Sequence, residues 1–173
     1  VAKRLNEKFG LTVLIDNDLH VATNVARKYS NYQEGITVLY AYGRRKSGSG
    51  IIANGEVLCG ASGAAGEVEN IPLHTPDIES ERIAFCSERL QAIIALMNPG
   101  RVVIYELDEG MDTDKLIGLI KSKMKPYLLP EFKLGRDFFE DCFLGLSIVC
   151  EVGIKQSLRE RLDFYTTRGI SII

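Results

Sequence analysis

The sequence predicts an α/β protein in which helices flank a mixed sheet, and two patterns lead to this prediction. Short apolar runs rich in β-branched residues alternate with longer segments of helical periodicity along the chain. One pair of apolar runs is separated by Asn54-Gly55, a strong signal for a tight hairpin turn because both turn residues need positive φ. Alternating strands and helices with one hairpin are typical of a layered α/β fold.

The composition predicts a single domain. The chain has 173 residues, of which 46% are apolar, enough to bury a substantial core. A formal net charge of −2 argues against a nucleic-acid-binding surface on this chain. We find neither a signal peptide nor an apolar run of membrane-spanning length, so we expect a cytoplasmic protein without a membrane partner. The chain begins at Val1 inside an expected helix, which predicts that a further segment precedes it.

The periodicity sets the expected order of the elements. We expect helices over residues 1–9, 19–29, 78–97, 112–124 and 138–163, and strands over 11–15, 36–42, 101–105 and 132–134, with the hairpin between the second strand and the third helix. The tail over 166–173 is a candidate edge strand. The four cysteines, Cys59, Cys86, Cys142 and Cys150, lack the spacing of a metal site and are expected to be buried, reduced thiols.

Two polar stretches stand out as candidate ligand sites. Asp16-Asn17-Asp18 follows the expected strand over 11–15, and the carboxyl ends of parallel strands are where α/β proteins bind ligands. The alternative is that Asn17 or Asp18 only caps the next helix. The second stretch runs through Gly60, Gly63 and Gly66 to Glu67, whose carboxylate is either a helix cap or a ligand contact.

A basic loop lies between the second strand and the hairpin. Arg44, Arg45 and Lys46 stand beside glycines and could hold a phosphate. The spacing is not that of a phosphate-binding loop that opens a helix, so we favour a solvated turn.

Three blocks resemble the C-terminal lobe of the ROK family, which comprises repressors, open reading frames and sugar kinases. The first is Phe9-Gly10-Leu11 with Ile15-Asp16-Asn17-Asp18. The second runs from Gly48 through Asn54-Gly55 and Gly60-Ala61 to Gly66-Glu67, and the third is Ala95-Leu96-Met97-Asn98-Pro99 followed by Val102-Val103-Ile104. The resemblance implies a ribonuclease-H-like lobe of the actin/hexokinase type over residues 1–173. It also implies that a first lobe, and any helix-turn-helix head, lies outside the given sequence.

The resemblance implies that Asn17, Asp18, Glu67 and Asn70 bind sugar, the first three forming half of a buried sugar pocket. Carboxylate and amide oxygens suit this task because they accept hydrogen bonds from sugar hydroxyls in fixed geometry. In a kinase, Asp18 would be the base that takes the proton of the attacking sugar hydroxyl. Without a phosphate cradle, no residue is expected to be catalytic.

The departures from the family pattern concern the nucleotide and the metal. Arg44-Arg45-Lys46-Ser47-Gly48 stands where kinases of the family have a glycine turn that contacts nucleotide phosphates. Tyr105-Glu106 replaces two glycines that let adenine approach, and Asn70 replaces a histidine that binds both sugar and zinc. The cysteine-rich zinc loop is replaced by residues 72–80. The resemblance therefore implies neither a metal nor a nucleotide cofactor for this chain.

The sequence favours the effector-sensing, self-associating lobe of a sugar-responsive transcriptional regulator. Its partners would be a sugar or sugar-phosphate effector, a second copy of the chain, and DNA through a separate N-terminal head. The alternative is an ATP-dependent sugar kinase that uses Asp18 as base and Glu67 as sugar ligand. A third hypothesis is a degenerate scaffold that no longer binds sugar.

Overall fold

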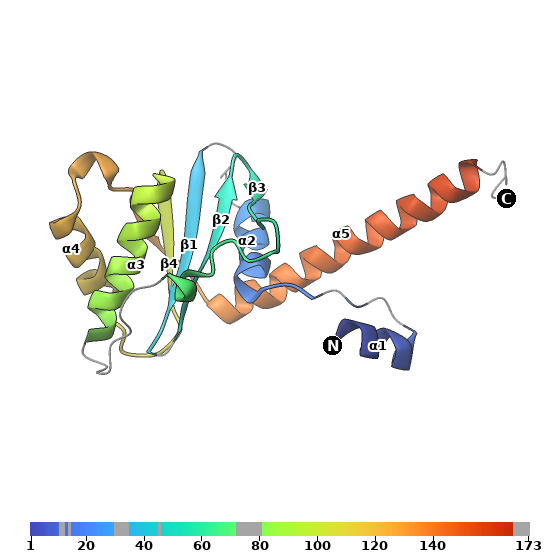
Figure 1. Cartoon of the computed structure of the whole chain (residues 1–173), viewed down its shortest axis with the longest axis horizontal. Coiled ribbons are helices and arrows are strands. Elements are labelled where there is room, and N and C mark those ends of the chain that lie inside the picture. Colours follow the sequence, from blue (N-terminus) through green and yellow to red (C-terminus); the bar gives the residue numbers. More distant parts are fainter. Residues whose placement is uncertain (11–12, 14, 30–34, 45, 72–80, 168–173) are drawn as a thin grey trace.

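A five-stranded mixed sheet forms the centre of the molecule (Figure 1). The computed structural model describes residues 1–10, 13, 15–29, 35–44, 46–71 and 81–167. The strands are β1 (Ile36–Tyr42), β2 (Ser47–Ala53), β3 (Glu56–Val57), β4 (Arg101–Glu106) and β5 (Glu131–Leu134), in the spatial order β3-β2-β1-β4-β5. β1 is antiparallel to β2 and parallel to β4, and β4 is parallel to β5. The predicted fold class, a mixed sheet flanked by helices, is confirmed.

Helices cover both faces of the sheet. α3 (Arg82–Met97) and α4 (Thr113–Lys123) lie on one face, and α2 (Asp18–Tyr29) lies on the other with the beginning of α5 (Phe138–Thr167) packed on it (Figure 1). Short 3-10 helices occur at η1 (Val68–Asn70) and η3 (Pro126–Leu128). Alternation along β1 divides the core, because Val38 and Tyr40 join the α3/α4 cluster while Leu39 and Ala41 join the α2/α5 cluster.

The glycines of β2 let α2 lie directly on that strand. A Cβ at Gly50 would come within 2.0 Å of the Thr23 hydroxyl oxygen, and a Cβ at Gly48 within 2.4 Å of the Leu19 side chain. Since both contacts need a residue without a Cβ, the Gly-Ser-Gly pattern sets the distance between helix and strand. The N-terminus of α2 is thereby held beside the start of β2.

Several predicted turns and helix ends are confirmed. Asn54 and Gly55 take φ values of 49° and 81° in the turn between β2 and β3. Asn98 ends α3 in the left-handed conformation with φ 44°. The Asp112 side chain caps α4 by accepting a hydrogen bond of 2.8 Å from the Lys115 backbone N–H.

Other predictions need correction. Most of the strand expected over 11–15 lies outside the described residues, and Ile15, expected to be buried, is 67% exposed and not in a strand. All four cysteines are free thiols, but only Cys86 is buried, while Cys142 is half-buried and the others are exposed. The candidate edge strand over 166–173 lies outside the described residues except for its first two, which belong to α5.

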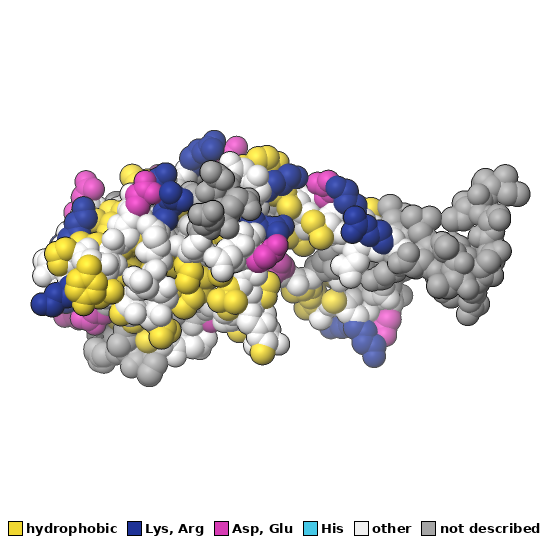
Figure 2. All heavy atoms as spheres, turned by 90° about the horizontal axis from the view of Figure 1, so that it is seen from above, with side chains coloured by type: hydrophobic (Ala, Val, Ile, Leu, Met, Phe, Trp, Pro, Cys, Tyr) yellow, Lys and Arg dark blue, Asp and Glu magenta, His cyan; other side chains and the backbone are white. Residues whose placement is uncertain are grey.

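Two helices extend away from the layered body (Figure 1). α1 (Ala2–Phe9) has no buried residue, and α5 continues well past its contact with α2. On the face seen in Figure 2, basic, acidic and hydrophobic side chains are interspersed. In the part of the chain that the structure describes, no helix is long and apolar enough to cross a membrane.

Candidate functional site

A polar pocket lies at the carboxyl end of the parallel strands β1 and β4. It is lined by Asn17, Asp18, Leu19, Ala41, Lys46, Ser47, Gly48, Ser49, Gly66, Glu67, Leu107 and Phe138. The sheet edge where α/β proteins bind ligands therefore carries three of the four predicted sugar-binding residues. Its volume of about 80 Å³ is well below the roughly 300–1,000 Å³ of typical small-molecule sites.

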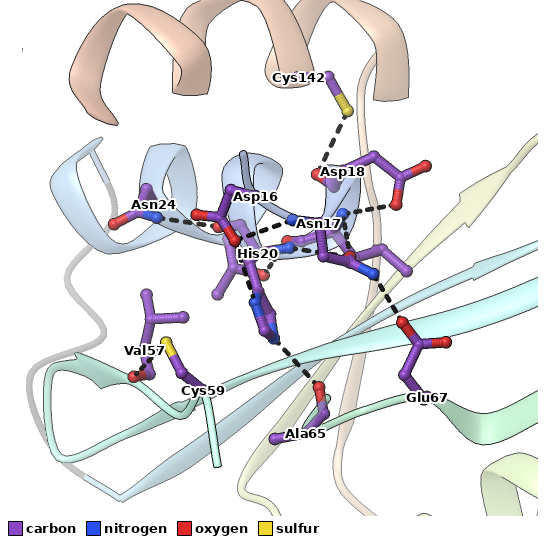
Figure 3. A network of polar contacts seen from close by, with 12 residues as sticks. Asp16, Asn17, Asp18, His20, Asn24, Val57, Cys59, Ala65, Glu67 and Cys142 are labelled. Carbon is purple, nitrogen blue, oxygen red and sulfur yellow. Dashed lines mark hydrogen bonds and ion pairs between the residues drawn. The ribbon is translucent and has the colours of Figure 1, made fainter. Parts of the chain in front are cut away.

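Asn17 holds together the two segments that form the polar wall of the pocket (Figure 3). Its amide oxygen accepts hydrogen bonds from the backbone N–H groups of Leu19 at 2.8 Å and His20 at 3.4 Å, so it caps α2. Its amide nitrogen donates to the Glu67 carboxylate at 2.7 Å. Asn17 therefore does cap α2, but capping is not its only contact, because the same side chain also bonds Glu67, the second predicted ligand residue.

Asp18 and Glu67 are more accessible than expected. Both are exposed rather than buried, and Asn17 is half-buried, which corrects the expectation of a buried pocket. Asp18 is the first residue of α2, where the helix dipole favours its negative charge. A ligand bound there would stay in contact with solvent unless another part of the protein covered it.

The backbone at Gly66 sets the position of Glu67. Gly66 has a φ of 91°, and its carbonyl accepts a hydrogen bond of 2.9 Å from the Ser49 N–H at the edge of β2. A Cβ at Gly66 would approach the Ser49 carbonyl oxygen to 1.9 Å. Asn70, the fourth predicted residue, ends η1, is exposed, and is not among the residues that line the pocket.

His20 forms a second bridge between α2 and the glycine loop, and the sequence analysis did not find it. The residue is 2% exposed, with Nδ1 at 3.3 Å from the Asp16 carboxylate and Nε2 at 3.1 Å from the Ala65 carbonyl oxygen (Figure 3). Because a carbonyl oxygen can only accept, Nε2 donates to Ala65. His20 therefore supports Glu67 indirectly, by fixing the loop before it.

Cys142 brings α5 to the same site. Its thiol lies at 3.5 Å from the Asp18 carbonyl oxygen (Figure 3). Burial, followed by the negative charges of Asp18 and Asp141, raises the pKa of the Cys142 thiol to about 11, against an opposing effect of Lys46. The thiol is therefore neutral at physiological pH and acts as a packing group and weak donor.

A network of two arginines, one carboxylate and a serine lies on the α3 side of the sheet. We call Ser47, Glu69, Arg82 and Arg89 the Glu69 cluster. Arg89 Nη1 lies at 2.7 Å from Glu69 Oε2, Arg82 Nη2 at 3.4 Å from Oε1, and the Ser47 hydroxyl donates to Oε1 at 2.6 Å. The sequence analysis missed this cluster because both arginines lie within a helix recognised by its apolar spacing, and charged residues in such helices are usually exposed.

The basic loop forms a turn whose backbone groups are hydrogen-bonded within the loop and to Asp108. The Gly43 N–H donates to the Lys46 carbonyl at 2.9 Å, and the Arg44 N–H donates to the Asp108 carboxylate at 2.7 Å. The Arg44 guanidinium also reaches the Glu109 carbonyl at 3.3 Å. Arg45 lies outside the described residues.

The side chains of the two residues at the end of β4, Tyr105 and Glu106, both make hydrogen bonds to other side chains. Tyr105 is buried, packs edge-on against Phe138 and donates its hydroxyl to Asp141 at 2.7 Å. Glu106 accepts a hydrogen bond from Thr113, whose hydroxyl lies at 2.9 Å from the Tyr42 hydroxyl. Burial is the main reason that the pKa of Tyr42 rises to about 12, so this hydroxyl stays protonated.

Comparison with known proteins identifies the family. A model of the ROK family matches residues 1–89, which is just over half of the chain. The chain belongs to the ROK family. Its sequence finds no match among curated proteins. Among the described residues, no group of three or more His, Cys, Asp or Glu side chains is placed to hold a metal ion.

Solved structures of ROK proteins share this fold. The ROK hexokinase from Thermus thermophilus is 15% identical with a TM-score of 0.66, over 90% of this chain and 70% of that one. A ROK glucokinase from Streptomyces griseus, in complex with glucose and AMPPNP, is 13% identical with a TM-score of 0.57, over 83% and 70%. A ROK transcriptional regulator, a homologue of the E. coli MLC protein, is 15% identical with a TM-score of 0.53, over 77% and 50%. Proteins of both activities therefore have the actin/hexokinase-like fold of this chain.

Proposed function

We propose that this chain is the effector-sensing lobe of a sugar-responsive transcriptional regulator that does not transfer phosphate. The observation that supports this proposal most strongly is the difference between the two sides of the site. The sugar side keeps Asn17, Asp18 and Glu67 around an open polar pocket. On the other side, the turn at residues 43–47 is bonded to Asp108 and Glu69.

The closed turn argues against a nucleotide because its donors are already used. By the family resemblance, this turn is where kinases contact the phosphates, yet the Ser47 hydroxyl and N–H and the Arg44 N–H all donate to carboxylates of the chain itself. A carboxylate at such a position repels the negative charge of a triphosphate. Tyr105, which replaces a glycine of the family pattern, packs against Phe138 rather than leaving room for a purine.

The proposed mechanism is a population shift. A sugar that accepts from Asn17 and donates to Glu67 would compete with their 2.7 Å hydrogen bond, which joins the start of α2 to the glycine loop. The binding energy that differs between the joined and separated arrangements is what can shift their equilibrium. In the proposed regulator, a second copy of the chain and a separate DNA-binding head transmit that shift in the cytoplasm.

Calorimetric titration of the full-length protein with hexoses, amino sugars and their phosphates tests this proposal. We expect heat of binding from at least one sugar, and its loss in Glu67→Ala. Glu56→Ala is the matched control, because Glu56 pairs with Arg27 on the exposed surface. Absence of heat from every sugar would support the degenerate scaffold and overturn the sensing role.

A sugar kinase is the second candidate, and the placement of Asp18 favours it. This carboxylate is exposed in the pocket at the N-terminus of α2, at the position that the family resemblance assigns to the base. A base there could take the proton of a sugar hydroxyl once an ordered nucleotide lay beside Ser47. ADP release that depends on both a hexose and Asp18 would decide for the kinase.

A further inference from the structure

The His20 ring lies between two hydrogen-bond acceptors. Nε2 is 3.1 Å from the Ala65 carbonyl oxygen in the glycine loop (residues 59–67), and Nδ1 is 3.3 Å from the Asp16 carboxylate (Figure 3). A carbonyl oxygen can only accept a hydrogen bond, and the same is true of an ionised carboxylate. Both ring nitrogens are therefore placed to donate.

Imidazolium is the form of the ring that satisfies both contacts. A neutral imidazole has one N–H group and one bare nitrogen, so one of its nitrogens would face an acceptor without a proton. A bare Nδ1 would face the negative charge of Asp16, and a bare Nε2 would face the Ala65 oxygen. Since the His20 side chain is 3% exposed, solvent does not supply the missing donor. The geometry thus fits a positively charged His20 paired with a negatively charged Asp16.

The contact with His20 joins the glycine loop to α2. The loop is anchored to β2 at both ends, by backbone hydrogen bonds of 2.8 Å and 2.9 Å. Residues 59–64, between these anchors, are exposed. Release of Ala65 from the ring would therefore loosen the segment that leads to Glu67.

Asp16 is the charged group in direct contact with the ring. The charged and titratable side chains of the surrounding elements are Asp16 and Asp18 at the start of α2, Arg27 later in α2, Glu56 of β3, and Cys59 and Glu67 of the glycine loop. Arg27 is paired with Glu56 at 3.0 Å, and Glu67 accepts from Asn17 at 2.7 Å. The charge of His20 is therefore balanced mainly by Asp16.

We propose that His20 is a proton-dependent switch, in which the imidazolium holds the glycine loop on α2 and loss of a proton to solvent releases the loop. The remaining proton stays on Nδ1, because the Asp16 carboxylate is a stronger acceptor than a neutral carbonyl. Nε2 is then bare and faces the Ala65 oxygen, so this contact is lost. The loop is therefore held at lower pH and released as the pH rises. Because the loop ends at Glu67, the switch links pH to the shape of the polar pocket, whatever that pocket binds.

Nitrogen NMR of the full-length protein with isotopically labelled histidine measures the charge of the ring. The signal that is absent from a His20→Gln variant belongs to His20. We expect protons on both nitrogens of this ring while the loop is held, and a proton on Nδ1 alone after the loop is released. A neutral ring in protein whose loop is held would mean that Asp16 carries the proton, and would overturn the proposal.

Hydrogen exchange of the glycine loop between about pH 5 and pH 9, followed by mass spectrometry, gives the second readout. Loss of one hydrogen bond predicts exchange that is faster by about threefold to tenfold at the alkaline end, after correction for the intrinsic effect of pH. This increase should follow the same pH curve as the charge of His20.

Asp16→Asn tests whether the charge pair is the cause. An asparagine amide can offer either its oxygen or its N–H group to Nδ1, so a neutral ring can keep its proton on Nε2 and hold the loop. The pH dependence of loop exchange should therefore disappear in this variant. Asp114→Asn is the matched control, because it removes an exposed carboxylate at the start of α4 and should leave the pH dependence as in wild type.

Two results of the exchange experiment would also overturn the proposal. One is wild-type loop exchange that does not depend on pH, and the other is a pH dependence that persists in Asp16→Asn. If Asp16→Asn does not fold, His20→Gln carries the test, because a glutamine N–H can donate to Ala65 without titrating and its loop exchange should not depend on pH. All of these measurements are made without sugar, so their failure leaves the sugar titration with Glu67→Ala unaffected.

Discussion

Replacement of Asn17 separates its two roles, as the cap of α2 and as the partner of Glu67. Asn17→Ser keeps an oxygen that can cap the helix but removes the amide donor to Glu67. Asn17→Ala removes both functions. Asn17→Asp keeps the cap and places a second carboxylate at the position that now lies 2.7 Å from the Glu67 oxygen.

The expected losses follow from these contacts. Loss of the cap costs about 1 kcal/mol. The hydrogen bond to Glu67 is worth about 0.5–1 kcal/mol, at the low end of the range, because Glu67 is exposed. We therefore expect a loss of about 1.5–2 kcal/mol for Asn17→Ala and about 0.5–1 kcal/mol for Asn17→Ser. Asn17→Asp should be destabilised by repulsion from Glu67, and salt should reduce that loss.

Urea unfolding of the four proteins at low and high salt measures these differences, with an unchanged m value as the check that the unfolding reaction is the same. The decisive comparisons are Ser against Ala, and Asp at low against high salt. Equal stability of the Ser and Ala variants would refute the capping role. An Asp variant insensitive to salt would refute the close approach of residue 17 to Glu67.

Three further predictions concern positions around the site. Burial alone would raise the pKa of Glu69, but hydrogen bonds from Ser47 and Arg89 outweigh it and leave the pKa below its usual 4.5. The stability that this ionised carboxylate contributes is present above that pH and is lost as the pH falls. The Tm advantage of wild type over Glu69→Gln should therefore shrink between about pH 5 and pH 3. Gly66→Ala should cost about 1–3 kcal/mol or more in urea unfolding, because its φ of 91° is unfavourable for alanine and its Cβ would meet a backbone oxygen; a neutral result would contradict the described path of the loop. Gly145→Ala should cost about 1–3 kcal/mol, because its Cβ would lie 2.1 Å from the Val21 carbonyl oxygen where α5 crosses α2; unchanged stability would mean that the two helices pack differently.

The sequence was informative wherever a local pattern decides the structure. The Asn54-Gly55 turn and the strand over 36–42 were predicted with their bounds, because turn chemistry and apolar runs are local properties. Asn17, Asp18 and Glu67 were grouped through the family resemblance, and the structure places all three at one pocket with Asn17 bonded to Glu67. The predicted roles of Asn17, Asp18, Glu67 and Asn70 in sugar binding stay predictions.

The features that sequence reasoning missed depend on contacts between distant segments. Arg89 is buried because Glu69 and Ser47 surround it, and neither residue is near it in the sequence. His20 is buried for the same reason, through its contact with Ala65. A weak signal existed in the two arginines, which are seven residues apart in a helix with an apolar stripe and therefore lie on one face.

ADP release by the full-length protein, with ATP and a panel of hexoses and N-acetylhexosamines, tests the central claim most directly. Since the donors of the turn at residues 43–47 are held by Glu69 and Asp108, we predict no sugar-dependent ADP above the rate of an Asp18→Asn variant. Sugar-dependent turnover that disappears in Asp18→Asn would contradict the claim and identify the protein as a kinase.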